Sequence, residues 1–339
     1  MLNAKTHKKF TASGDKEAEI LLEKVLAEIG GTLSGTGLCV FLGGSYGRGD
    51  GGVRLDKENG ILYNDLDFFV FAGKNSVNAG TLLKEIAEKY GKILKVDVDF
   101  SRIMTIADIK NNAPRLMMQE LKRGYHLVCG EDLLAEYLPE IPAEKLPFSE
   151  ACRLLLNRGM GLLLAGEKIN RNSDDMDFIL RNINKAILGA CDAVLVAGKK
   201  YQWMLDDRLA AVNNSDLSNE CKKLYARAVE FKKSPDRVPG QDLKDLLSDT
   251  RDIFKKCMTG ICGENCAGLY DCCKKSGEVS LKNFIKYCIR LRCIPATDWR
   301  KCTMPAVVVL LPYLYQALDD MPEVMVSESK LYQQWLIFN

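Results

Sequence analysis

The sequence predicts an α+β domain over residues 1–147, followed by an all-α helical domain over residues 148–339. Short apolar runs bounded by glycine and polar residues, as in buried strands, occur in the first third of the chain. Beyond Pro114 the apolar residues recur at helical spacing instead. The two regions are separated by a cluster of prolines that indicates a linker, formed by Pro139, Pro142 and Pro147.

The first domain is expected to combine helices with three strands. Ser13-Gly14-Asp15 offers N-caps for a helix that runs through Ile29, and Gly30-Gly31 is expected to end it. A second helix is predicted over residues 81–89. The predicted strands cover residues 38–42, 66–71 and 93–100, the last because apolar and polar residues alternate along it.

The bulk composition is that of an ordinary globular protein. Of 339 residues, 47% are hydrophobic and 27% are charged, and this length is enough for two domains that each bury a core. The net charge is only +2 at pH 7. Proteins that coat a long nucleic acid normally carry a larger positive excess, so we expect no such partner.

No segment of the sequence is typical of a signal peptide or a membrane span. The N-terminus lacks an apolar stretch followed by a small-residue cleavage site. The longest apolar run, near residues 306–311, is much shorter than the roughly 18 residues that a span needs. We therefore expect a cytoplasmic protein with no membrane partner. Its 13 cysteines are an odd number in a long chain without an export signal, which favours reduced thiols.

Two pairs of aspartates lie on the predicted strands. Asp65 and Asp67 are two residues apart, so both carboxylates project from one face of their strand. The apolar run at residues 68–71 indicates a buried strand, where adjacent negative charges are costly unless a cation lies between them. Asp97 and Asp99 repeat the same spacing on the third strand. If the two strands are neighbours, three or four carboxylates converge, and such oxygen ligands suit Mg²⁺ or Mn²⁺.

A glycine-rich turn follows the first predicted strand. In Gly43-Gly44-Ser45 the glycines would let backbone N–H groups approach a phosphate closely, and the serine hydroxyl would be a further donor. Arg48 would add a charge-assisted contact. A phosphate-binding turn that faces a carboxylate cluster is typical of metal-dependent phosphoryl or nucleotidyl transfer.

Together these motifs resemble the nucleotidyltransferase superfamily typified by DNA polymerase β. The resemblance rests on Gly43-Gly44-Ser45, on Asp65-Leu66-Asp67 and on a separate strand that bears Asp97 or Asp99. It covers roughly residues 38–100 and continues more loosely over residues 124–133, which look like the strand and turn that close many bacterial members. It implies a polymerase β-like nucleotidyltransferase domain with a mixed β-sheet, and the helical second domain fits this family in outline.

The resemblance also implies a role for each matching residue. Residues 43–45 would hold the phosphates of a nucleoside triphosphate such as ATP. Asp65 and Asp67 would bind two metal ions. Asp97 or Asp99 would bind the catalytic ion and help to deprotonate the attacking hydroxyl. Both lie between apolar residues, so the motif alone does not choose between them; Asp97 is the first choice and Asp99 the second. An acceptor hydroxyl would receive the nucleoside monophosphate group, and pyrophosphate would leave.

The interval between Ser45 and Asp65 is longer than is usual in this superfamily. The extra segment, residues 51–63, is predicted to be a β-hairpin with Glu58-Asn59-Gly60 at its tip. A set of uncharacterised bacterial nucleotidyltransferases is similar to this chain in Gly47-Arg48-Gly49-Asp50-Gly51-Gly52 and in Tyr63-Asn64 before the aspartates. The insertion leaves the acceptor open, and a small molecule, a protein side chain and an RNA end all remain candidates.

Two features of the second domain have alternative interpretations. Lys185 shares a predicted helix face with Asp192. It would either reach the β- and γ-phosphates, as a helical-domain lysine does in several relatives, or remain a surface lysine. The cysteine-rich stretch 257–302 suggests a metal site, but it contains no Cys-x-x-Cys pair and matches no structural zinc spacing, which favours thiols packed in a helical core.

The expected function is therefore metal-dependent nucleotidyl transfer from a nucleoside triphosphate. One alternative is a regulator of the same fold that binds nucleotide without turnover. Another is an RNA-terminal nucleotidyltransferase, which predicts a basic groove in the helical domain that the near-neutral net charge does not favour.

Overall fold

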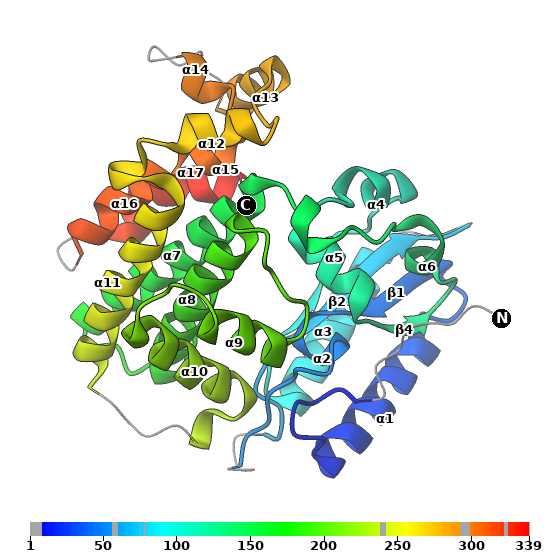
Figure 1. The fold of residues 1–339 in the computed structure, drawn as a ribbon. Coiled ribbons are helices and arrows are strands. Elements are labelled where there is room, and N and C mark those ends of the chain that lie inside the picture. The colour runs from blue at the N-terminus through cyan, green and yellow to red at the C-terminus, as the bar shows by residue number, and fades with distance from the viewer. Residues whose placement is uncertain are drawn as a thin grey trace. The chain divides into compact units, whose positions relative to one another are not determined.

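The computed structural model describes residues 9–55, 60–74, 76–77, 79–237, 242–291, 299–321 and 325–338. The chain divides into two compact units (Figure 1). The first unit comprises Met1–Pro142, Trp203–Asp206 and Val229–Pro239, and the second comprises Ala143–Gln202, Asp207–Ala228 and Gly240–Asn339. Two short segments from beyond residue 147 thus pack with the first unit.

A four-stranded mixed sheet forms the centre of the first unit, with the strand order β3-β2-β1-β4. Strand β1 (Leu38–Leu42) pairs antiparallel with β2 (Leu66–Ala72) and with β4 (His126–Cys129). Strand β2 pairs parallel with β3 (Val98–Phe100). The α+β class expected from the sequence is confirmed.

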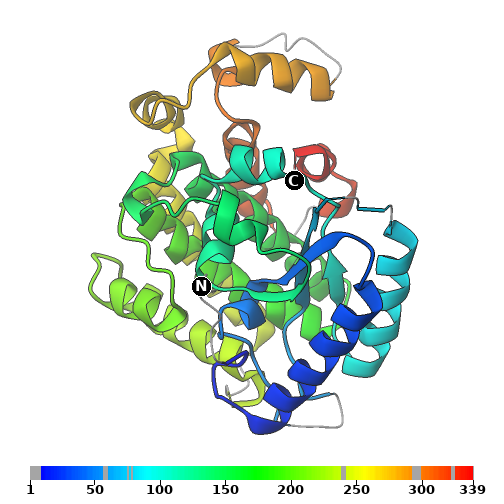
Figure 2. The same cartoon turned by 90° about the vertical axis from the view of Figure 1, so that its right-hand side faces the viewer.

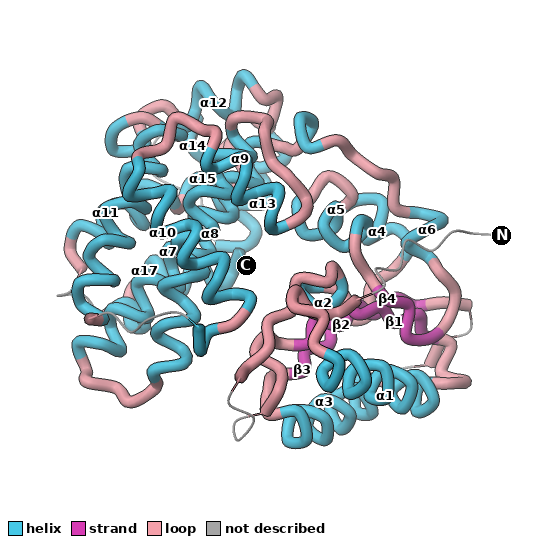
Figure 3. Tube along the Cα trace, turned by 60° about the horizontal axis from the view of Figure 1, so that its bottom comes forward, coloured by secondary structure: helices cyan, strands magenta, loops and turns pink. Residues whose placement is uncertain are grey.

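Helices pack against both faces of this sheet (Figure 3). Their bounds are α1 (Lys16–Leu33), α3 (Gly80–Leu94), α4 (Ile106–Asn112), α5 (Leu116–Arg123) and α6 (Leu133–Tyr137). Helices α1 and α3 lie side by side against one face, where Val40 is buried in a core with Leu22 and Ile86. Helices α4, α5 and α6 pack against the other face, where Phe41 and Phe71 are buried. Each face of the sheet therefore has its own apolar core.

Helix α1 continues past the two glycines that were expected to end it. Asp15 caps its start as predicted, accepting a hydrogen bond from the backbone N–H of Ala18 at 3.0 Å. The end lies at Leu33, however, so the prediction from Gly30-Gly31 is wrong. A Cβ on Gly30 would lie 2.6 Å from the backbone oxygen of Val128 in β4. Gly30 is needed for the close approach of the helix to the sheet, and not for a C-cap.

The third predicted strand is shorter than expected because α3 runs to Leu94. Lys95 follows with a left-handed backbone (φ 55°), and its N–H donates to the oxygen of Gly91 at 2.9 Å. This residue ends the helix in the conformation that glycine usually adopts there. Only Val98–Phe100 then pairs with β2, so the alternation at Leu94–Val96 belongs to a helix end and a turn.

The segment inserted before Asp65 pairs like a hairpin in its described part. Val53 and Leu62 form an antiparallel bridge, and the N–H of Arg54 donates to the oxygen of Ile61 at 2.8 Å. Of the predicted tip, Glu58 and Asn59 lie outside the described residues.

A short helix links β1 to the segment inserted before Asp65. From Ala143 onward the described chain contains helices and no strands. The link is α2 (Gly44–Gly47). The later elements are η2 (Ala143–Lys145), α7 (Phe148–Asn170), α8 (Met176–Ala197), α9 (Leu205–Asn213), α10 (Asn219–Lys233), η3 (Pro235–Arg237), α11 (Leu243–Cys262), η4 (Glu264–Cys266), α12 (Leu269–Lys275), α13 (Leu281–Leu291), α14 (Trp299–Cys302), α15 (Ala306–Val309), α16 (Leu311–Asp319), η5 (Val326–Glu328) and α17 (Lys330–Phe338). Helices α7, α8 and α11 pack together and bury Leu155, Ile187 and Phe254. Among the described residues, no helix has the length and apolar character needed to cross a membrane.

Candidate functional site

Asp67 and Asp99 lie at one level of the sheet on neighbouring strands. The parallel register pairs the Cα of Asp67 in β2 with the Cα of Asp99 in β3, and neighbouring strands are about 4.8 Å apart. The intervening residues Leu66, Phe68 and Val98 belong to the core that packs with α1 and α3. Because side chains alternate along a strand, both aspartates project from the opposite face. The two predicted carboxylate strands are thus neighbours.

Asp65 and Asp97 each precede one of these strands by one residue. The N–H of Leu66 donates to the backbone oxygen of Asp97 at 2.9 Å, which joins the two strand ends. Asp65 is half-buried and Asp97 is exposed. Asp65 lies two residues before Asp67, and Asp97 lies two residues before Asp99. Because side chains alternate with a period of two, Asp65 and Asp97 fall on the same face of the sheet as Asp67 and Asp99.

The carboxylate set has the donor chemistry of a site for a hard divalent cation. Its oxygen atoms suit Mg²⁺ or Mn²⁺ better than a soft metal. Within the described ranges, no three or more His, Cys, Asp or Glu side chains are already gathered as a group that could hold a metal ion. The backbone aligns the four aspartates, and metal binding would require their side chains to turn toward one ion.

Gly44 places backbone directly against the carboxylate of Asp67. The N–H of Gly43 donates to the backbone oxygen of Asp67 at 2.8 Å, which continues the antiparallel pairing of β1 with β2 by one residue. Gly44 has a left-handed backbone (φ 61°), and a Cβ there would meet Oδ2 of Asp67 and lie 2.9 Å from its Cγ. A Cβ on Gly43 would lie 2.7 Å from the ring of Phe69. Both positions therefore need glycine.

The hydroxyl of Tyr46 holds the chain that leads to Asp65. It accepts hydrogen bonds from the N–H groups of Tyr63 at 3.0 Å and Asn64 at 3.2 Å, and it donates to the oxygen of Gly52 at 2.8 Å. Asn64 Oδ1 also accepts from the N–H of Gly52 at 2.7 Å. Tyr46 is fully buried. The role of Tyr46 was not predicted from the sequence. The feature that could have indicated it is a large side chain with a polar hydroxyl inside a glycine-rich turn.

Ser45 and Arg48 have different surroundings in the same turn. Ser45 is half-buried, and its backbone oxygen accepts from the N–H of Asp50 at 2.9 Å. Arg48 is buried (8% exposed) and forms ion pairs with Glu120 at 3.3 Å and with Asp50 at 3.7 Å. The guanidinium of Arg48 thus joins the turn to α5 inside the first unit.

Lys185 belongs to the second unit, on α8, and is half-buried. Asp192, expected on the same helix face, is buried and accepts a hydrogen bond from the hydroxyl of Tyr225 at 2.7 Å. It also lies 3.7 Å from the guanidinium of Arg208. Asp192 is thus held within the helical unit, and the contact of Lys185 with nucleotide phosphates stays a prediction.

The cysteine-rich stretch consists mostly of buried free thiols in its described part. Cys257, Cys262, Cys266 and Cys273 are buried and form no disulfide, Cys302 is also buried, and Cys293 lies outside the described residues. The Cys262 thiol has hydrogen-bond partners in Cys152 and Cys266, and the bond to Cys152 together with burial raises the pKa of Cys262. Thiols of this kind are poor nucleophiles and behave as small apolar side chains.

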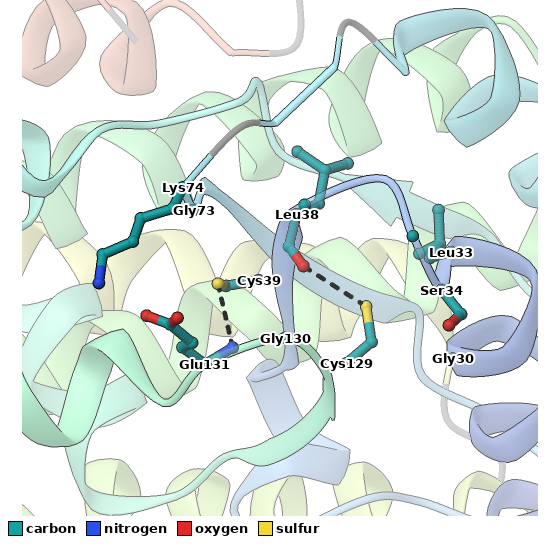
Figure 4. A pocket seen from close by; sticks show the side chains of 12 residues that line it. Gly30, Leu33, Ser34, Leu38, Cys39, Gly73, Lys74, Cys129, Gly130 and Glu131 are labelled. Atoms are coloured by element: carbon teal, nitrogen blue, oxygen red, sulfur yellow. Dashed lines mark hydrogen bonds between the residues drawn. The ribbon is translucent and has the colours of Figure 1, made fainter.

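A cavity that the sequence analysis did not anticipate lies at the other end of β1 and β2 (Figure 4). It has a volume of about 460 Å³, and its lining includes Gly35, Cys39, Lys74, Cys129 and Glu131. The Cys39 thiol accepts from the N–H of Glu131 at 3.2 Å, and the Cys129 thiol donates to the oxygen of Leu38 at 3.8 Å. Burial raises the pKa of both thiols. Neither is a reactive nucleophile, so we place no chemistry in this cavity.

No protein-family model matches the chain, and a comparison with curated proteins finds no match to it. The interpretation of the site therefore rests on the residues and contacts described above.

Proposed function

We propose that this chain is a metal-dependent nucleotidyltransferase with a polymerase β-like catalytic domain. The proposal depends on one arrangement: Asp67 is aligned with Asp99 across two strands, and the backbone of Gly44 lies against the Asp67 carboxylate. Two aligned carboxylates repel each other unless a cation lies between them. Glycine backbone in such a turn can present its N–H groups to a phosphate at close range. Metal and triphosphate would therefore meet at Asp67.

Three carboxylates are proposed as the metal ligands. Asp65, Asp67 and Asp99 would hold Mg²⁺ or Mn²⁺, which would neutralise the triphosphate and acidify the acceptor hydroxyl. We favour Asp99 over Asp97 as the third ligand because Asp99 is the direct register partner of Asp67. The Asp99 carboxylate would also accept the proton of the acceptor hydroxyl.

The phosphate contacts come from the glycine turn. Gly43 and Gly44 would let the triphosphate approach the backbone, and the hydroxyl of Ser45 would donate a hydrogen bond to it. Lys185 of the helical unit is the proposed cation for the β- and γ-phosphates. Arg48 is assigned to the structure of the turn, because its guanidinium is paired with Glu120 and Asp50.

The proposed reaction forms a bond between an acceptor oxygen and the α-phosphorus of a nucleoside triphosphate. The bond from the α-phosphorus to the bridging oxygen breaks, and pyrophosphate leaves with that electron pair. The acceptor is a hydroxyl of a small molecule, a protein side chain or an RNA end.

The test compares the wild-type chain with Asp65→Asn and Asp67→Asn. Each is incubated with the four α-labelled nucleoside triphosphates, Mg²⁺ or Mn²⁺, and small-molecule, protein and RNA acceptor pools. Both substitutions are expected to reduce label transfer by at least about 100-fold, the scale for losing charge stabilisation at a reacting phosphate. Glu23→Gln, which changes an exposed carboxylate on α1, is the matched control and should leave transfer unchanged.

Two results would contradict the proposal. Transfer that persists undiminished in both asparagine variants would exclude the aspartates as metal ligands. Metal-dependent nucleotide binding by the wild type, without label transfer to any acceptor pool, would indicate a regulator instead of an enzyme.

A further inference from the structure

Helix α13 (Leu281–Leu291) exposes a stripe of large aliphatic side chains. Leu281, Ile285 and Ile289 are 66%, 50% and 70% exposed, and their spacing of four residues puts them on one side of the helix. Tyr287, on another side, is buried. Helix α13 therefore has one side packed against its own unit and a separate apolar side in solvent. A contiguous exposed stripe of this kind marks an interaction surface.

The charged residues of α13 itself are all positive. Lys282, Lys286 and Arg290 each follow a stripe residue by one position, and all three are exposed. Helix α13 contains no aspartate or glutamate. Lys274 and Lys275 at the end of α12 are exposed as well. In a chain whose net charge is only +2, this is a local basic surface, and its complement is an anionic partner.

Glu278, three residues before α13 in the sequence, directs its carboxylate toward the start of α7. The carboxylate of Glu278 accepts the N–H of Ser149 at the start of α7, with both oxygens at 3.2 Å. Arg290 is oriented by a 2.9 Å hydrogen bond from its guanidinium to the backbone oxygen of Ile337 in α17. Ile337 and its neighbour Leu336 are themselves exposed, at 45% and 57%. The end of α17 thus adds aliphatic surface beside the end of α13.

Helix α13 lies at one end of the second unit and packs mainly against α14 (Figures 1 and 2). The exposed aliphatic side chains of α13 project outward from the helix, so the stripe forms a ridge and not a groove. A protein that bound it would have to supply a surrounding groove. A lipid surface needs only an apolar ridge with cations beside it, because the aliphatic groups enter the boundary of the acyl chains while the lysines reach the headgroup phosphates.

We propose that α13 is a peripheral membrane contact that places Leu281, Ile285 and Ile289 in the surface of an anionic bilayer. Lys282 and Lys286 bind the headgroup phosphates. This inference is independent of nucleotidyl transfer. It also revises the expectation of no membrane partner, which considered spanning segments and not a helix that lies on a surface.

The test is co-sedimentation of the full chain with vesicles of phosphatidylcholine alone or mixed with phosphatidylglycerol. Binding is expected to the mixed vesicles only, and to weaken as salt screens the charges. Ile285→Asp and the double variant Lys282→Glu/Lys286→Glu should each lower the partition coefficient by at least about tenfold, since each cation near an anionic surface contributes on the order of a fivefold effect. Ile20→Asp and Lys24→Glu change exposed residues of α1 and are the matched controls, expected to bind like the wild type.

Three results would overturn the proposal: no sedimentation with mixed vesicles at low salt, equal binding to neutral vesicles, or binding that survives both α13 variants. A shift from dimer to monomer in Ile285→Asp, with vesicle binding unchanged, would identify the stripe as a contact between copies of the chain instead. Circular dichroism establishes that each variant is folded. If Ile285→Asp unfolds, Lys282→Gln/Lys286→Gln tests the same prediction without placing a charge in the stripe.

Discussion

Asp67 and Asp99 are direct partners in the parallel register of β2 and β3, whereas Asp97 lies outside β3, where its backbone oxygen accepts from the N–H of Leu66. Strand geometry fixes the first pair at the spacing of neighbouring strands. Both Asp97 and Asp99 are exposed, but Asp97 sits in the turn that follows α3.

The two candidate third ligands are therefore expected to differ in function. Asp99→Asn should lower nucleotidyl transfer by at least about 100-fold, as for loss of a metal-binding carboxylate. Asp97→Asn should lower it by less than about tenfold, because Asp97 lies outside β3 and is not the register partner of Asp67. The measurement is the initial rate of label transfer across a Mg²⁺ titration. The opposite order of effects would move the third ligand to Asp97.

Gly44→Ala is expected to remove activity from a chain that still folds. A Cβ at this position would displace the Asp67 carboxylate, and the left-handed backbone adds about 1–2 kcal/mol of strain. The control is Gly31→Ala, where a Cβ meets nothing within 4 Å in the interior of α1. That change should raise the free energy of unfolding by about 0.5–1 kcal/mol and leave transfer unchanged. Full activity in Gly44→Ala would exclude a role for this close approach.

The Tyr46 hydroxyl is expected to stabilise the approach to Asp65. Tyr46→Phe leaves the N–H groups of Tyr63 and Asn64 without this acceptor and should lower the free energy of unfolding by about 2 kcal/mol. Urea denaturation measures this effect. Tyr313→Phe removes a hydroxyl from an exposed side chain (59%) and should change stability by less than about 0.5 kcal/mol. Equal stability of Tyr46→Phe and the wild type would show that the hydroxyl does not hold this loop.

Local patterns were sufficient to predict β1 and β2, but of the third predicted strand only its last three residues form β3. Apolar runs bounded by glycine and polar residues located β1 and β2 closely, and the spacing of two placed each aspartate pair on one face. The pairing of β2 with β3 was stated only as a condition. The parallel register of β2 and β3 is a contact between segments that are distant in sequence. The periodicity of apolar residues within one segment does not predict such a contact.

Packing between distant segments accounts for most of what the sequence did not predict. The approach of α1 to β4 decides the role of Gly30, and the left-handed Lys95 decides where α3 ends. The contact of Arg48 with phosphate beside the glycine turn stays a prediction. The carboxylate partner of Arg48, Glu120, lies 72 residues away in sequence, so this pairing was not visible locally.

Arg48 and Glu120 are expected to behave as one stabilising pair. Both side chains are largely buried, at 10% and 19% exposure, so removing one partner leaves a poorly solvated charge. Arg48→Gln and Glu120→Gln should each lower the free energy of unfolding by about 3 kcal/mol, and the double variant should lose less than the sum. If Arg48 instead bound phosphate, its substitution would raise the KM for nucleotide while Glu120→Gln would not.

The last prediction concerns the acid stability of the first unit. Three hydrogen bonds lower the pKa of Asp108 to about 2. The largest effect comes from the Arg102 guanidinium, and smaller ones come from the backbone N–H and the hydroxyl of Thr105. Thr105 Oγ1 accepts from the N–H of Asp108 in return, which completes a capping box at the start of α4. A carboxyl group whose pKa is depressed by folding stabilises the fold above its unfolded pKa of about 3.9, and this stabilisation is lost as the pH falls toward about 2.

Asp108→Ala should therefore lower the free energy of unfolding by about 1 kcal/mol near neutral pH, mainly through the lost cap. The Arg102 side chain is mostly exposed (68%), so the ion pair itself adds little and Arg102→Gln should cost less than about 0.5 kcal/mol. Urea denaturation from about pH 6 to about pH 2 measures the difference between wild type and Asp108→Ala, which should shrink through this range as the wild-type carboxylate is protonated. A deficit that stays constant over the whole range would show that the charge of Asp108 does not contribute to the cap.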